Sequence, residues 1–364
     1  MKHITLILAL CMTFALSAQT PKNVKYDFTE ASTLTLTGKL FPDTPNPYHR
    51  VDTARFKGFS AAENQLLRTT TGIAVAFRTN SSTISVKSEY AYLNYGLSTG
   101  AYALRGYDLY IKRDGKWIWA AAGCPPVNRE NGYNTVLIRD MDDTMKECLL
   151  YLPVRSELKS VQIGVESGAN IEKIDNPFRH RIAIFGSSFT HGISTSRAGM
   201  SYPAQFCRET GLGLLSLACS GNSKLQSYFA ELLAASDAEA FVFDGFSNPT
   251  ADKIRARLFP FIETIQAAHP GKPLIFMRTI YREKRNFDQT VAASEEEKWA
   301  VADSLMRIAV KRYPDVYYID CTNATDSRHD SSVDGIHPGD HGYTLWMESV
   351  RRPLLRILHK YGIR

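Results

Sequence analysis

The 364-residue chain is predicted to begin with an all-β sandwich and to continue as a three-layer α/β/α domain built on a parallel sheet. Between residues 21 and 178 the sequence consists of short β-rich runs separated by turn signals. From residue 179 onward, short apolar strands alternate with helical stretches. Each half is long enough to bury its own hydrophobic core.

Residues 1–20 have the layout of a secretory signal peptide. Lys2 and His3 precede the apolar run 4–16, and small and then polar residues follow it. The run is too short to span a bilayer, and Cys11 lies inside it, which does not fit a lipoprotein anchor. The alternative is a buried N-terminal strand or helix. We therefore expect a secreted or periplasmic protein that is not stably inserted in a membrane. Association with the bacterial cell envelope stays open.

Composition and charge are those of an ordinary globular protein. Hydrophobic residues make up 44% of the chain and charged residues 22%, with a net charge of +6. Basic residues gather at 278–285 beside the acidic run 295–297, and we interpret this region as a solvated surface. No motif or basic stripe for nucleic-acid binding is present in the sequence. The cysteines after residue 20 show no metal-binding spacing, and a disulfide between Cys124 and Cys148 stays open.

The predicted sandwich domain, residues 21–178, consists of short strands. The turn signal Asp114-Gly115 separates the runs 108–113 and 117–119, which predicts a hairpin. Many short strands with few helical periods are typical of a sandwich with a jelly-roll-like arrangement. The other predicted strands are 72–77, 83–87, 135–138, 147–152 and 160–165.

The predicted α/β domain, residues 179–364, alternates strands and helices. Nearly continuous apolar strands between helices indicate a parallel sheet that is covered on both faces. Ligands bind at the carboxyl ends of such strands, and Ser188, Gly221 and Asn248 each follow one of these ends. The expected strands are 181–185, 212–218, 240–243, 273–277 and 316–319, and the helices are 202–210, 225–235, 252–268, 294–311 and 341–360.

A short turn near the C-terminus, Asp334-Gly335-Ile336-His337, contains an acid and a histidine just before the last predicted helix. A serine hydroxyl is a weak nucleophile that needs a base, and the base needs a carboxylate that fixes its tautomer. This turn could supply both groups to Ser188. An Asp-Gly beside a His-Pro is also common in plain turns, but its position before the last helix favours a catalytic role.

Four sequence blocks now support a family resemblance. The runs 186–188, 220–222, 245–248 and 334–337 resemble the four blocks of SGNH (GDSL-type) esterases, in the same order and at strand ends. In the first half, residues 106–110 (Gly-Tyr-Asp-Leu-Tyr) resemble the GxDLY motif of a β-sandwich domain that precedes some of these hydrolases in secreted bacterial proteins. The resemblance implies a flavodoxin-like SGNH hydrolase domain after the sandwich.

The resemblance also assigns roles to individual residues. Ser188 would be the nucleophile and His337 the general base, oriented by Asp334. The oxyanion hole would use the backbone N–H groups of Ser188 and Gly221 and the side-chain amide of Asn248. Such pre-aimed donors stabilise the charge that develops on a carbonyl oxygen.

The chain departs from the family pattern at two positions. Ser187 stands where the first block usually has an acid, which leaves two adjacent serines; we choose Ser188 because it aligns with the family's serine. Asn248 lies three residues after Gly245 rather than two, which makes its assignment less secure than that of the triad.

The predicted activity is that of a serine esterase acting on O-acyl, in particular O-acetyl, esters of a polysaccharide or oligosaccharide, without a metal or organic cofactor. The alternatives are an acyltransferase, a lipid or small-ester acylhydrolase with the same site, and a non-catalytic carbohydrate-binding protein. His341 lacks a third ligand that would join it to His337 in a metal site, and we expect it at the surface. Five tyrosines could either stack on sugar rings or pack within the fold: Tyr90, Tyr92, Tyr95, Tyr102 and Tyr107.

Overall fold

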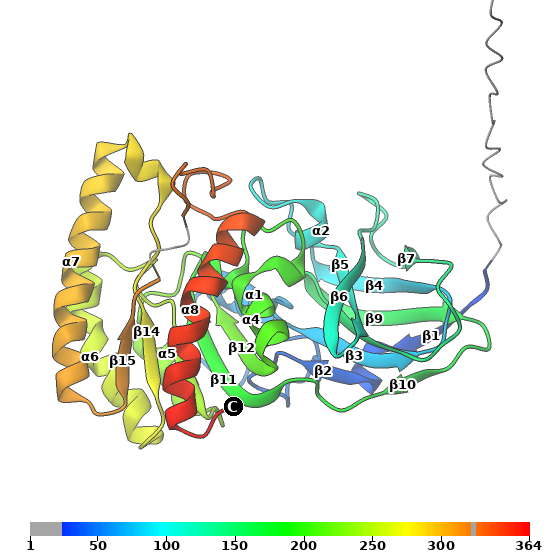
Figure 1. Cartoon of the computed structure of the whole chain (residues 1–364), viewed down its shortest axis with the longest axis horizontal. Helices are drawn as coiled ribbons and strands as arrows, with labels where there is room; N and C mark the ends of the chain where they lie inside the picture. The colour runs from blue at the N-terminus through cyan, green and yellow to red at the C-terminus, as the bar shows by residue number, and fades with distance from the viewer. Residues whose placement is uncertain (1–23, 322–324) are drawn as a thin grey trace, which may run out of the picture.

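The computed structural model describes residues 24–321 and 325–364. A β-rich lobe and a lobe of helices around a sheet lie side by side (Figure 1). The predicted signal peptide, including Cys11, lies outside the described residues. Among the helices that are described, none combines the length and apolar character needed to cross a bilayer.

The first lobe is a sandwich of two antiparallel sheets, as predicted. One sheet has the strand order β1-β9-β4-β7 and the other β10-β3-β8-β5-β6, with β2 paired to β3. Inward-facing residues of both sheets, such as Phe77, Leu109 and Ile163, form one buried core. The strands are β1 (Tyr26–Glu30), β2 (Thr35–Thr37), β3 (Ala74–Thr79), β4 (Ile84–Tyr92), β5 (Tyr107–Arg113), β6 (Lys116–Gly123), β7 (Thr135–Ile138), β8 (Lys146–Tyr151), β9 (Glu157–Glu166) and β10 (Ile171–Lys173).

The first lobe also contains two short helices that were not predicted, α1 (Ala61–Arg68) and α2 (Ala101–Leu104). At the start of α1, the Ser60 side chain accepts a hydrogen bond from the Glu63 backbone, and the Glu63 carboxylate accepts one from the Ser60 backbone. This capping box satisfies two backbone donors and explains where the helix begins. The Ser-x-x-Glu spacing was visible in the sequence, but eight residues give too weak a helical period to recognise.

The second lobe has the predicted parallel sheet, in the order β12-β11-β13-β14-β15. This is the flavodoxin-like order in which the first strand lies between the second and the third. The predicted strands 212–218, 240–243 and 316–319 have the observed bounds. The strands are β11 (Arg179–Gly186), β12 (Leu212–Ala218), β13 (Ala240–Phe243), β14 (Leu274–Met277) and β15 (Val316–Ile319).

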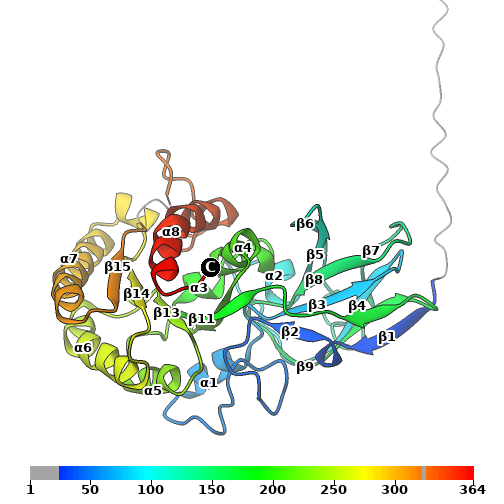
Figure 2. The same ribbon diagram turned by 60° about the horizontal axis from the view of Figure 1, so that its bottom comes forward.

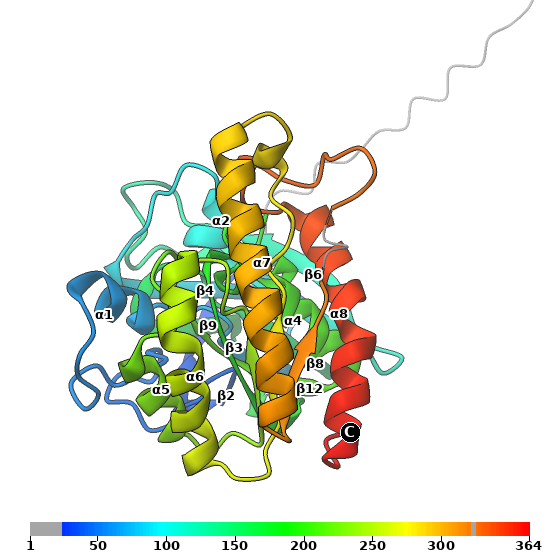
Figure 3. The same cartoon turned by 90° about the vertical axis from the view of Figure 1, so that its left-hand side faces the viewer.

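Helices cover both faces of this sheet (Figure 3). Alternate residues of β11 point to opposite sides: Ile184 packs in the core that includes α4 and α8, and Phe185 packs in the core that includes α5, α6 and α7. This alternation explains why the strands read as continuous apolar runs. The helices are α3 (Ser188–His191), α4 (Tyr202–Thr210), α5 (Ser227–Ala234), α6 (Ala251–Ala268), α7 (Gln289–Arg312) and α8 (Asp340–Lys360).

The two lobes share a hydrophobic core. Tyr110, Leu149 and Tyr151 of the sandwich pack in the same buried cluster as Tyr202 and Trp346 of the second lobe. The lobes are in contact along this junction (Figure 2). The two halves therefore pack closely against each other.

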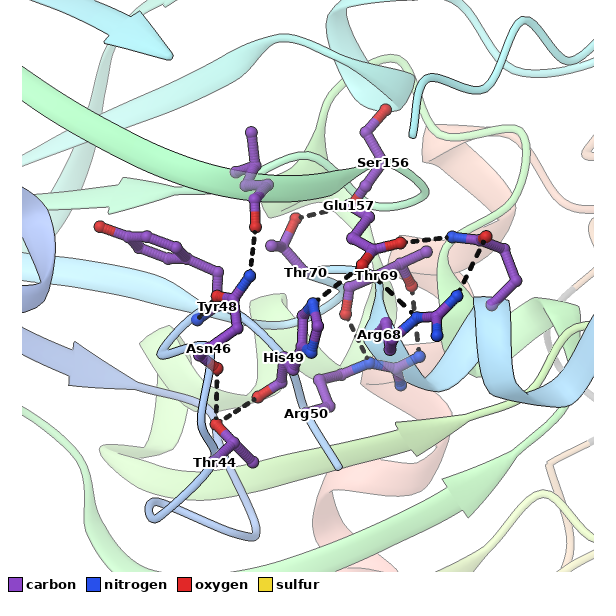
Figure 4. A network of polar contacts seen from close by, with 12 residues as sticks. Thr44, Asn46, Tyr48, His49, Arg50, Arg68, Thr69, Thr70, Ser156 and Glu157 are labelled. Carbon is purple, nitrogen blue, oxygen red and sulfur yellow. Dashed lines mark hydrogen bonds and ion pairs between the residues drawn. The ribbon is translucent and has the colours of Figure 1, made fainter. Parts of the chain in front are cut away.

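Arg50 forms a second link between the lobes and is completely buried. Its guanidinium donates hydrogen bonds to the backbone carbonyl of Thr69 in the first lobe at 2.9 Å. It also donates to the carbonyls of Ser216 and Ala218 on β12, at 3.2 and 3.0 Å. Burial lowers its pKa to about 10. Figure 4 shows Arg50 beside Thr69 and the neighbouring contact between His49 and Glu157.

The structure decides two expectations from the sequence, on the cysteines and on the charged segments 278–285 and 295–297. Cys124 and Cys148 are both free, as are the other described cysteines, so the structure contains no disulfide between them. The interpretation of the basic cluster as solvated surface was wrong for part of it. Glu295 and Arg285 are only 3% and 8% exposed and pair with Arg282 and Glu296, whereas Lys284, Glu296 and Glu297 are exposed.

Candidate active site

Three strand ends bring the predicted catalytic elements together. Strand β11 lies between β12 and β13, and Phe185 pairs with Leu217 on one side and with Phe243 on the other. Ser188, Gly221 and Asn248 lie in the segments that follow these strands, as the sequence predicted. The segments with Gly221 and Asn248 therefore lie on opposite sides of the segment with Ser188.

The two adjacent serines have different environments. Ser187 is completely buried; its hydroxyl donates to Asp244 Oδ2 at 2.5 Å and accepts a hydrogen bond from the backbone N–H of Phe189. The Ser188 hydroxyl instead donates to His337 Nε2 at 2.9 Å. Of the two serines, only Ser188 therefore has its hydroxyl hydrogen-bonded to an imidazole nitrogen, the kind of partner that a serine nucleophile requires.

The sharp turn before Ser188 depends on Gly186. A Cβ atom at this position would lie 2.0 Å from the Thr190 hydroxyl oxygen and 3.0 Å from the Asp244 Cβ. Only glycine allows the chain to pass so close to these side chains and then enter α3.

His337 and Asp334 lie in a tight loop before α8. The His337 Nδ1–H group donates to Asp334 Oδ2 at 2.8 Å, which leaves Nε2 as the acceptor that faces Ser188. The Asp334 Oδ1 atom accepts the backbone N–H groups of Ile336 and His337 at 3.0 and 2.7 Å. These contacts fix the imidazole ring relative to its carboxylate.

The same contacts keep Asp334 ionised. Partial burial raises the pKa of Asp334, but the N–H groups of His337 and Ile336 outweigh this effect and hold it below the ordinary value of 3.8. A carboxylate in this state can stabilise a cationic imidazolium without taking its proton.

The predicted oxyanion donors follow β12 and β13. Gly221 has a φ of +73°, a left-handed conformation that favours glycine. Asn248 donates one amide hydrogen to the Ser223 hydroxyl at 2.9 Å, which fixes the amide plane and leaves its second N–H group available.

Asp244 is a buried residue near the site that the sequence analysis missed. Its carboxylate accepts hydrogen bonds from the Ser187 and Thr190 hydroxyls and also from Ser247, the residue before Asn248. Burial raises its pKa, although these donors partly offset the effect. Asp244 thus holds together the turn that carries Ser188 and the loop that carries Asn248. Its place directly after an apolar strand was the available signal.

A buried ionic cluster supports the same loop. Arg282 and Lys298 both donate to the Ser247 carbonyl, at 2.5 and 3.3 Å, and both pair with Glu295 at 3.1 and 2.6 Å. The sequence placed these charges at a solvated surface, because linear spacing does not reveal that the chain folds over them.

The described residues contain no group of three or more His, Cys, Asp or Glu side chains that could hold a metal ion. His341 is half exposed and lies 3.4 Å from Asp326, at the start of α8.

The five candidate tyrosines divide into two groups. Tyr90 and Tyr107 are buried in the sandwich, where their hydroxyls are 3.1 Å apart. Tyr92, Tyr95 and Tyr102 are 38%, 53% and 50% exposed. Only the second group can offer a ring face to a ligand.

Comparisons with known proteins agree with this architecture. Residues 179–355 match the GDSL-like lipase/acylhydrolase family, and residues 25–171 match the N-terminal domain of SGNH hydrolase-type esterases, the GxDLY domain. No curated protein sequence matches the chain.

Solved structures share the arrangement along nearly the whole chain. A protein from Bacteroides ovatus ATCC 8483, described as a GDSL-like lipase, is 36% identical with a TM-score of 0.88, covering 92% of this chain and 98% of that one. The salicylyl-acyltransferase SsfX3 from a tetracycline biosynthetic pathway is 22% identical with a TM-score of 0.67, covering 93% and 99%. A family two carbohydrate esterase from Cellvibrio japonicus is 11% identical with a TM-score of 0.58, covering 92% and 98%.

The fold and these matches define an ester hydrolase of the SGNH type. The chain belongs to the GDSL-like lipase/acylhydrolase family and has an N-terminal GxDLY domain.

Proposed function

We propose that the protein is a secreted serine esterase that removes O-acyl groups, in particular O-acetyl groups, from a polysaccharide or oligosaccharide. The observation that carries this proposal is the hydrogen-bonded series of Ser188, His337 and Asp334, with contacts of 2.9 and 2.8 Å. This series has the order and the atoms that nucleophilic acyl transfer requires.

The reaction would proceed in two halves. His337 Nε2 takes the proton of the Ser188 hydroxyl while Ser188 Oγ bonds to the ester carbonyl carbon; the bond from that carbon to the sugar oxygen then breaks, and His337 gives the proton to this oxygen. In the second half, His337 takes a proton from water as the water oxygen attacks the acyl carbon; the bond to Ser188 Oγ breaks, the acid leaves, and the proton returns to Ser188. The developing oxyanion would accept hydrogen bonds from the backbone N–H groups of Ser188 and Gly221 and from the Asn248 amide.

Two observations support a carbohydrate as the acylated substrate. The fold is shared with a family two carbohydrate esterase. The sandwich also exposes Tyr95, whose ring is held by its hydroxyl contact with Glu130 at 2.9 Å and by the Arg105 guanidinium 5.1 Å from the ring centre. A fixed and exposed aromatic ring suits the apolar face of a sugar.

The test is acetate release from a panel of acetylated polysaccharides by the full chain without residues 1–20, with Ser188→Ala as the control. We expect release from at least one polymer, faster turnover of p-nitrophenyl acetate than of the butyrate, and no release by the variant. Activity that survives Ser188→Ala would refute the assigned nucleophile. A preference for long acyl chains, or acyl transfer to an added alcohol that outpaces hydrolysis, would refute the substrate class or the hydrolytic outcome.

A further inference from the structure

The GxDLY motif places a buried carboxylate at the junction of the two lobes. Asp108, on β5 of the sandwich, has a side chain that is 0% exposed. Its carboxylate accepts hydrogen bonds from Arg197 Nη1 at 3.0 and 2.9 Å and from the backbone N–H of Gly199 at 2.8 Å. Both donors belong to the second lobe. A third donor, the indole N–H of Trp119 at 3.0 Å, comes from the neighbouring strand β6.

The contact is shaped closely around Asp108. A Cβ atom at Gly199 would lie 2.7 Å from Asp108 Oδ2, so no other residue would fit there without displacement. The Arg197 guanidinium also donates to the Tyr110 hydroxyl at 2.6 Å and lies 5.0 Å from the centre of the Trp119 ring. Charge pairing, backbone pairing and ring contacts therefore converge on one short segment of the second lobe.

This segment, residues 192–201, begins directly after α3, the helix that starts at Ser188. On its other side it contacts the start of α8: Asp340 accepts hydrogen bonds from the Ser196 backbone N–H at 2.8 Å and from the Ser196 hydroxyl. The Tyr343 hydroxyl of α8 donates to the Ile193 carbonyl at 2.8 Å. Because Asp340 is only three residues after His337, the segment connects the sandwich to the loop that carries the histidine.

We propose that Asp108 is a positioning residue for catalysis, which acts by holding segment 192–201 between the sandwich and the His337 loop. This proposal rests on the proposed role of His337 and Ser188. The route passes from Asp108 to Arg197 and Gly199, along the backbone to Ser196, and through Asp340 to His337. The sandwich is then a structural part of the catalytic centre, in addition to any role in binding the substrate.

The main test compares Asp108→Asn with Glu147→Gln in the full chain, using p-nitrophenyl acetate. Glu147, on β8, pairs with Lys112 at 2.9 Å; Lys112 is on β5, the strand that carries Asp108, and the two side chains are 43% and 37% exposed. We expect Asp108→Asn to lower kcat by about 10- to 100-fold, the range in which a small displacement of catalytic groups acts, with KM changed less than threefold. Glu147→Gln should keep the parental kcat and KM.

Ser196→Ala keeps the test informative if Asp108→Asn does not fold. Ser196 is exposed, so the substitution removes its hydroxyl contact with Asp340 without disturbing a core. It should lower kcat by several-fold and add little further loss in the Asp108→Asn background, because both residues act along one route. A parental kcat in soluble Asp108→Asn, or in Ser196→Ala if Asp108→Asn does not fold, with Ser188→Ala inactive, would overturn the positioning role alone. An active Ser188→Ala would instead refute the assigned triad.

Discussion

The two adjacent serines give opposite predictions for activity and stability. Ser187→Ala removes a hydroxyl that donates to the buried Asp244 carboxylate at 2.5 Å and accepts the Phe189 backbone N–H. Ser188→Ala removes a hydroxyl whose partner is His337. One variant should therefore lose stability and keep activity, and the other should lose activity and keep stability.

The magnitudes follow from these partners. A hydrogen bond to a charged group contributes about 1.5–3 kcal/mol, and Asp244 would retain its contacts with the Ser187 backbone, Thr190 and Ser247. We expect Ser187→Ala to lower the free energy of unfolding by about 2 kcal/mol, which lowers Tm by roughly 3 °C in a chain of this size. Its kcat should stay within about tenfold of the parent, since its backbone N–H still binds Asp244.

Ser188→Ala should behave in the reverse way. Its turnover should fall by more than about 10⁴-fold because the nucleophile is gone. Its free energy of unfolding should change by less than about 1 kcal/mol, since a single hydrogen bond to His337 is lost. The assays are p-nitrophenyl acetate hydrolysis and thermal unfolding of both variants side by side. An inactive Ser187→Ala together with an active Ser188→Ala would show that the nucleophile is assigned to the wrong serine.

Three further predictions concern the same site. Asn248→Ala should lower kcat by about 10²–10³-fold, the cost of one oxyanion donor. Ser223→Ala removes only the contact that orients Asn248 and should lower kcat much less. Equal kcat values for the two variants would argue against the donor role. Gly186→Ala should lower kcat, and it should lower the free energy of unfolding by about 1–3 kcal/mol, because the new Cβ would overlap the Thr190 hydroxyl. A parental Tm would contradict the geometry of the turn. In the folded protein the pKa of Asp334 is held below 3.8, so the stability that its carboxylate contributes is present above that pH and is lost as pH falls through the lowered value. When Tm is measured against pH, the decrease of Tm at acid pH should be shallower for Asp334→Asn than for the parent. Identical decreases in the two proteins would rule this out.

Much of the fold was predictable because its periodicities are simple. The strand 212–218 and the helix 202–210 have the bounds that the alternation of apolar runs and helical stretches predicted. The start of α7 at Gln289 lies five residues before the predicted start at 294. Asp288 caps this helix through a hydrogen bond from the Val291 backbone, and such a cap outweighs a weak apolar pattern.

The candidate site was predictable where a residue's role depends on local sequence, and unpredictable where it depends on packing. His337 and Asp334 are three residues apart, so one loop determines their geometry. Asp244 accepts hydrogen bonds from Ser187 and Thr190, more than fifty residues earlier in the chain, and Arg282 reaches the Ser247 carbonyl from the loop after β14. Nothing in the linear spacing of these residues shows those contacts.

Residues 179–364 contain Ser188, His337 and Asp334, but they share a hydrophobic core with the sandwich. Removal of the sandwich would take Tyr110, Leu149 and Tyr151 out of this core and expose the apolar residues of the second lobe that they help to bury. It would also leave the β12 carbonyls without Arg50. Unpaired backbone carbonyls and a large exposed apolar face both oppose folding. The residues proposed as nucleophile, base and oxyanion donors all lie in the second lobe, but that lobe depends on the first lobe for part of its own core.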